Sequence, residues 1–141
     1  MPFMPRTLRE LAIAVECFVT LAWMRIALRL MPQRVLRGVI APRPAGRRRG
    51  DPIAIGAIFN RVAAGHPLRH TCMHRSLALQ RVLHRRGIAA ALQIGIGRKP
   101  VLFPGHAWLE VDGALVNDDP EIVARYVPLH ISETALRMSY R

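Results

Sequence analysis

The chain has 141 residues, 51% of them hydrophobic, a formal net charge of +12 and two cysteines. One domain of this size can bury a core without disulfide bonds or zinc, and no CxxC pair occurs. A small fold that depends on disulfide bonds or on a zinc ion is therefore excluded. A basic surface attracts acidic peptides, nucleic acid and anionic membranes alike, so charge selects no partner. We expect free thiols in a reducing cytoplasm and no metal.

Residues 1–50 are predicted to form an amphipathic helix and a basic loop, packed on a core formed by residues 51–141. The helix is expected over residues 7–31, where apolar residues recur at helical spacing. We expect this apolar stripe to pack on the core; its members are Leu8, Leu11, Val15, Phe18, Val19, Ala22, Trp23, Ile26 and Leu30. Glu16 and Arg25 interrupt the run, so neither a membrane span nor a signal peptide is expected, and membrane-surface association is a less favoured interpretation.

The rest of the chain alternates helical and extended patterns. In chain order we expect an exposed basic loop over residues 41–50, helices over 51–64 and 72–86, a strand over 88–96 and a hairpin from His106. Gly87 is a usual helix terminator, and Asp112-Gly113 is typical of a hairpin turn. The tail, residues 120–141, is weakly helical. Helices beside a small antiparallel sheet predict an α+β fold.

Two residues in this pattern indicate a thiol enzyme. Cys72 opens a helix and His106 opens a strand. The nucleophile of such enzymes is a thiolate, which the positive end of a helix and a neighbouring imidazolium both favour. The imidazole in turn needs a third polar group to fix its tautomer. The order cysteine, histidine, acid is that of papain-like enzymes, so Cys72 and His106 are candidate catalytic residues.

Hairpin geometry leaves the third residue open. A two-residue turn at Asp112-Gly113 places His106 opposite Asp119, whereas a three-residue loop with a G1 bulge places it opposite Asp118. A shift of one residue reverses the face, so only one of these acids can accept the Nδ1–H of His106. Glu110 shares the face of His106 but lies two positions along the strand, which makes it a weaker candidate.

Three segments together resemble the leader peptidase of lasso-peptide biosynthesis, a transglutaminase-like cysteine protease; they are residues 72–88, 92–97 and 106–113. The resemblance implies a papain/transglutaminase-like core, in which a Cys-bearing helix packs on a small antiparallel sheet. It implies a catalytic triad of Cys72, His106 and Asp118, and with Asp118 the three-residue loop. It also implies cleavage of the leader from a lasso-peptide precursor without a cofactor. That cut frees the core N-terminus for macrolactam formation by a separate ATP-dependent cyclase.

The same resemblance bears on partners. This family occurs fused to a leader-binding winged-helix module or as a stand-alone protease, and the helical, basic residues before the motif resemble the stand-alone form. A separate leader-recognition protein is then expected, and the loop from Arg43 to Arg49 is expected to help dock it. One alternative is an acyl-transferase of the same fold. Another is a basic adaptor for nucleic acid or membrane, which leaves the Cys–His–Asp order unexplained, so nucleic acid is not an expected partner.

Overall fold

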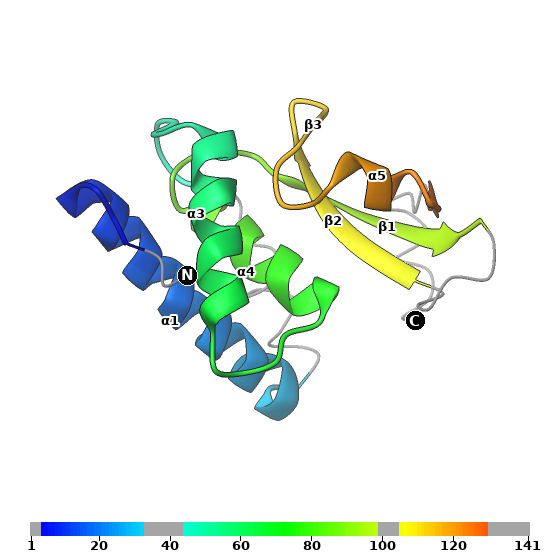
Figure 1. Ribbon diagram of the computed structural model, residues 1–141, viewed down its shortest axis with the longest axis horizontal. Coiled ribbons are helices and arrows are strands. Elements are labelled where there is room, and N and C mark those ends of the chain that lie inside the picture. The colour runs from blue at the N-terminus through cyan, green and yellow to red at the C-terminus, as the bar shows by residue number, and fades with distance from the viewer. Residues whose placement is uncertain (1–3, 33–43, 99–104, 130–141) are drawn as a thin grey trace.

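The structure is a computed structural model that describes residues 4–32, 44–98 and 105–129. Three long helices gather on one side of a curled antiparallel sheet (Figure 1), which makes the fold α+β as predicted. The helices in these ranges are α1 (Leu8–Leu30), α3 (Pro52–Gly65), α4 (Cys72–His84) and the short α5 (Pro120–Val123). The strands are β1 (Ala91–Gly97), β2 (Gly105–Val111), β3 (Ala114–Leu115) and β4 (Tyr126–Pro128). Arg43 and the tail from residue 130 lie outside the described residues.

Local capping signals explain where the helices begin. The Thr7 hydroxyl accepts the Glu10 N–H at the start of α1. The Asp51 carboxylate accepts N–H bonds at the start of α3, and Pro52 occupies the first helical position, where its missing N–H costs nothing. Thr71 caps α4 in the same way. Each observed helix starts within one residue of the predicted position, because these caps are encoded locally.

The prediction for the buried face of α1 was wrong. The helix packs on α3 and α4 through a face made of Ile13, Ala14, Cys17, Thr20, Leu21, Met24 and Ala27. The large residues of the predicted stripe are exposed instead, from Trp23 at 36% to Leu8 at 86%. Small side chains on the inner face of α1 allow the neighbouring helices to approach closely. Because both faces of α1 are apolar, the spacing of its apolar residues does not indicate which face is buried. By length and composition alone α1 could cross a membrane.

Helix α4 lies at the centre of the molecule, between α1 and α3 on one side and the sheet on the other (Figure 1). Its residues Leu79, Val82 and Leu83 are fully buried in a single hydrophobic cluster that also takes residues from α1, α3 and β2. The predicted N-terminal region and the predicted catalytic core therefore share one cluster. Burial of α4 on both sides fixes the position of its first residue, Cys72.

The basic loop over residues 44–50 is anchored to the end of α4. Backbone bonds run from the Ala45 N–H to the His84 carbonyl and from the Arg49 N–H to the Arg86 carbonyl, both at 2.9 Å. These contacts satisfy carbonyls that a helix end leaves without partners. Gly87, at φ +68°, permits this contact, because a Cβ there would lie 2.7 Å from the Gly46 carbonyl oxygen.

The sheet has the strand order β3-β2-β1-β4, and all its pairings are antiparallel. Val111 pairs with Ala114 across a two-residue turn whose residues, Asp112 and Gly113, both have positive φ, as a type I′ turn requires. The three-residue loop with a G1 bulge was therefore wrong. Strand β4 was not predicted, because its three residues are too short to show a periodic pattern.

Candidate active site

Cys72 is the first residue of α4 and a half-buried, free thiol. A capping box holds this end of the helix: the Thr71 hydroxyl accepts the His74 N–H, and His74 Nδ1 accepts the Thr71 N–H at 3.2 Å. Burial and the charge of Arg25 lower the pKa of His74, which favours the neutral ring, the form in which Nδ1 can accept this bond. The N–H groups at the start of α4 surround Cys72 with positive partial charge, the environment that a thiolate needs.

His106 and Asp118 form a direct pair on the sheet. His106 Nε2 lies 2.5 Å from Asp118 Oδ2, and the two side chains are 15% and 18% exposed. The other carboxylate oxygen, Oδ1, accepts the Asp119 N–H at 2.8 Å, so the carboxylate is held at both ends. The ring orientation corrects the sequence prediction, because Nε2 and not Nδ1 faces the acid. Nδ1 is thereby left for proton transfer with a substrate or a thiol.

Asp118 reaches His106 although the turn has two residues, a register that would have placed Asp119 opposite. Strand β3 ends at Leu115, so the strict alternation of faces does not continue to residue 118. Asn117 lies beyond the end of the β2–β3 pairing, and its side-chain oxygen, instead of a backbone carbonyl, accepts the Leu109 N–H. Asp119 instead caps α5 through the Glu121 N–H. Asp118, the acid that the family resemblance implied, is therefore the one that contacts His106, although the three-residue loop expected with it is absent.

Two aromatic rings enclose His106. The Tyr126 ring stacks on the imidazole with centroids 4.9 Å apart, and the Trp108 ring lies at 6.1 Å. Gly95 pairs with His106 across the sheet, and a Cβ there would lie 2.9 Å from both the Trp108 ring and the Tyr126 Cβ. Because glycine has no side chain, Gly95 leaves room for the Trp108 and Tyr126 rings. Glu110, the weaker candidate, accepts the Trp108 indole N–H at 3.1 Å and thus supports this enclosure, not His106 directly.

A buried hydrogen-bond chain connects the helix of Cys72 with the strand of His106. The Ser76 hydroxyl, one turn after Cys72, donates to the Ala107 carbonyl at 3.1 Å. Asn117 Nδ2 donates to the same hydroxyl at 3.1 Å, and Asn117 precedes Asp118 in the chain. Ser76 and Asn117 thus join the three segments that carry the candidate residues. Sequence reasoning missed both residues and Tyr126, because a lone Ser, Asn or Tyr carries no pattern.

Removing the buried hydrogen bonds of Ser76 or Asn117 should lower the free energy of unfolding. Asn117→Ala leaves the buried Leu109 N–H without its acceptor. Ser76→Ala removes the hydroxyl that donates to the Ala107 carbonyl and accepts from the Asn117 amide, so each change should cost about 1–3 kcal/mol of unfolding free energy. Urea unfolding followed by tryptophan fluorescence measures the loss. Asn60→Ala is the matched control, because Asn60 makes its bond to Arg75 in a half-buried position and its loss should cost about 1 kcal/mol or less. Equal midpoints for Asn117→Ala and Asn60→Ala would contradict the prediction.

The other histidines in the described ranges bond to residues outside the His106–Asp118 pair. His66 and His70 contact each other at 3.0 Å, and burial and the neighbouring imidazoles lower the pKa of His70 to about 4. His84 is buried at the end of α4, bonded to Ala90. Within the described ranges, no group of three or more His, Cys, Asp or Glu is placed to hold a metal ion.

Comparison with known proteins gives two matches. The family model of the transglutaminase-like superfamily matches residues 14–130, which include Cys72, His106 and Asp118. The microcin J25-processing protein McjB of Escherichia coli is 43% identical over 51 residues. That alignment covers 36% of this chain and 24% of the relative, so the chain spans about a quarter of the length of that protein. No solved structure matches significantly. Because the family model covers most of the chain, the protein belongs to the transglutaminase-like superfamily.

Proposed function

We propose that this protein is a cysteine peptidase that cuts the leader from a lasso-peptide precursor. The observation that carries the proposal is the bonded His106–Asp118 pair, tied through Ser76 to the helix that Cys72 opens. The similarity to a microcin J25-processing protein supports a peptide substrate of the lasso class. Superfamily membership supports thiol chemistry on an acyl group.

In the proposed mechanism Cys72 attacks the carbonyl carbon of the peptide bond between leader and core. His106 takes the thiol proton at Nδ1, because Nε2 is engaged with Asp118. The oxyanion that forms is stabilised by the Cys72 N–H at the positive end of α4. His106 then donates its proton to the departing amine, which releases the core peptide with a free N-terminus and leaves the leader as a thioester on Cys72.

Water completes the proposed cycle. His106, now neutral, accepts a proton from water as the water oxygen attacks the thioester carbon. The C–S bond then breaks, His106 returns that proton to the Cys72 sulfur, and the leader departs with a C-terminal carboxyl group. The Trp108 and Tyr126 rings limit water around the His106–Asp118 pair, which strengthens its hydrogen bond. A separate leader-recognition protein would deliver the precursor, and an ATP-dependent cyclase would use the freed amine. We place these steps in the reducing cytoplasm, where the thiol stays free.

Mass spectrometry of the reaction products tests this function. The whole chain is incubated with a lasso-peptide precursor and the leader-recognition protein specific for that precursor. We expect two fragments whose masses sum to that of the precursor plus one water. A leader fragment that carries an added amine instead of water would indicate acyl transfer. An intact precursor, in a sample whose Cys72 still reacts with a thiol reagent, would overturn the proposal.

A further inference from the structure

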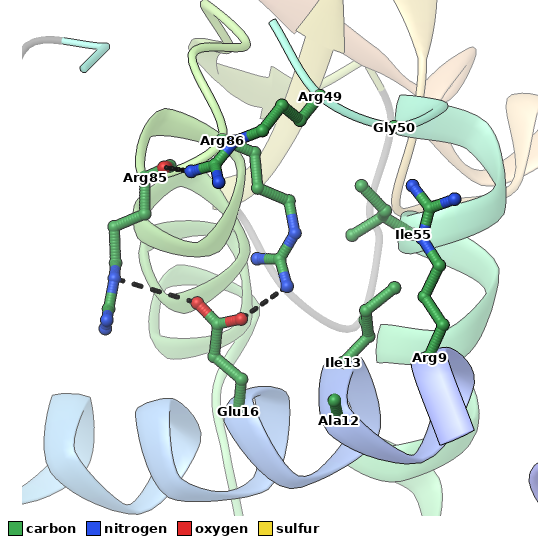
Figure 2. A pocket seen from close by; sticks show the side chains of 9 residues that line it. All are labelled: Arg9, Ala12, Ile13, Glu16, Arg49, Gly50, Ile55, Arg85 and Arg86. Carbon is green, nitrogen blue, oxygen red and sulfur yellow. Dashed lines mark hydrogen bonds and ion pairs between the residues drawn. The ribbon is translucent and has the colours of Figure 1, made fainter. Parts of the chain in front are cut away.

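A second site lies at the other end of α4 from Cys72. A pocket of about 460 Å³ opens between the first half of α1, the start of α3 and the end of α4. Figure 2 shows its basic and acidic side chains, which are Arg9, Glu16, Arg49, Arg85 and Arg86. Its apolar wall consists of Ala12, Ile13 and Ile55. The thirteen residues of α4 place this pocket about 20 Å from Cys72 along the helix axis.

The charges in this pocket are unbalanced. Glu16 lies between two guanidinium groups, 2.5 Å from Arg86 and 3.7 Å from Arg85, and so neutralises part of their charge. Arg49 donates to the Arg85 carbonyl and carries no carboxylate partner within the described residues. Arg9, which stands across the pocket from Glu16 in Figure 2, also has no acidic partner among those residues. Four guanidinium groups against one carboxylate leave the pocket cationic.

The chemistry of the pocket fits a peptide better than a nucleic acid. Arginine guanidinium groups bind carboxylates through paired hydrogen bonds. The apolar wall suits an aliphatic side chain beside such a carboxylate. Among the described residues, no aromatic side chain lines the pocket to stack on a base, which is the usual contact for single-stranded nucleic acid. An acidic residue next to an aliphatic one is therefore the complementary ligand.

We propose that this pocket binds an acidic-aliphatic segment of the leader in the precursor peptide. This inference rests on the proposed function, because it assigns a second contact to the same substrate. A bound segment about 20 Å from the thiol is separated from the cut bond by at least about six extended residues, so it lies outside the residues being cut, and we assign it to the leader. The pocket would raise the local concentration of the cleavage site at Cys72.

Direct binding tests this site without cleavage. Fluorescence anisotropy is measured with Cys72→Ala protein and a rhodamine-labelled nonapeptide of alternating Glu and Leu, and then with its Gln-Leu isostere. We expect the Glu peptide to bind at least tenfold more tightly. Arg9→Gln should weaken its binding about fivefold, and the Arg9→Gln/Arg49→Gln pair more than tenfold. Arg29→Gln is the matched control, because Arg29 is exposed in the last turn of the same helix; its effect should stay within twofold.

The outcomes distinguish a carboxylate-selective pocket from a surface that attracts any anion. Equal binding of the two peptides, or an equal loss from Arg29→Gln and Arg9→Gln, would overturn the proposal, since either result means that the pocket does not select carboxylates. Competition by oligo(dT) as strong as that by the unlabelled Glu peptide would also overturn it, in favour of a general polyanion surface. Arg9→Gln leaves the backbone anchors of residues 45–49 in place, so its result stands even if Arg49→Gln perturbs the loop. Precursor cleavage at saturating substrate tests the proposed function separately.

Discussion

Replacing Cys72 with Ala is expected to lower precursor cleavage by about 10³-fold or more while the protein stays folded. Cys72 is the proposed nucleophile and His106 the proposed general base, so His106→Ala should cost nearly as much and the double variant little more. Single-turnover cleavage rates, measured by mass spectrometry, give the comparison. Far-UV circular dichroism checks that both variants retain the helices. Near wild-type cleavage by Cys72→Ala would rule out this thiol as the nucleophile.

The second cysteine supplies the control for this experiment. Cys17 is fully buried in α1, and burial, with a smaller contribution from Glu16, raises the pKa of its thiol to about 12. Such a thiol is almost never a thiolate at neutral pH and is closed to reagents. Cys17→Ala should therefore keep its cleavage activity, with a stability loss of about 1 kcal/mol. Iodoacetamide should modify the wild-type protein once, at Cys72.

Asp118→Ala should reduce cleavage at least about 10²-fold, far more than Asp119→Ala. Asp118 holds Nε2 of His106, so its loss frees the ring to rotate and removes the charge that stabilises the imidazolium. Asp119 caps the four-residue helix α5, and its loss should cost about 1 kcal/mol of unfolding free energy with little effect on the rate. Cleavage rates and urea midpoints, measured together on both variants, separate the two effects. A larger rate loss for Asp119→Ala would assign the orienting role to that residue.

Local signals account for the part of the molecule that could be predicted. The caps Thr7, Asp51 and Thr71 mark helix starts, and a cap acts within three residues, so the sequence carries the whole interaction. The same holds for the Asp112-Gly113 turn, whose position was predicted correctly. The positions of Cys72 at a helix start and of His106 in a strand follow from such signals, and the family pattern supplied Asp118.

Features that depend on tertiary packing were missed. The outer and inner faces of α1 are both apolar, so which one is buried is decided by the shape of α3 and α4 and not by hydrophobicity. The end of β3 depends on the bond from Leu109 to Asn117, which joins segments that the register argument treated as continuous strands. Tyr126 reaches His106 only through the pairing of β4 with β1. These contacts join separate segments, and a single sequence shows no pattern for them.

Because α1 and α4 share one hydrophobic cluster, removal of α1 should affect the stability of α4, and the two helices should unfold together. Cys17, Leu21 and Met24 lie in the same hydrophobic cluster as Leu79 and Leu83 of α4. A shortened protein starting near residue 50 would therefore expose the helix that holds the candidate nucleophile. The N-terminal helix and the thiol-bearing helix should unfold in one two-state transition, so loss of the first thirty residues and loss of activity should occur together.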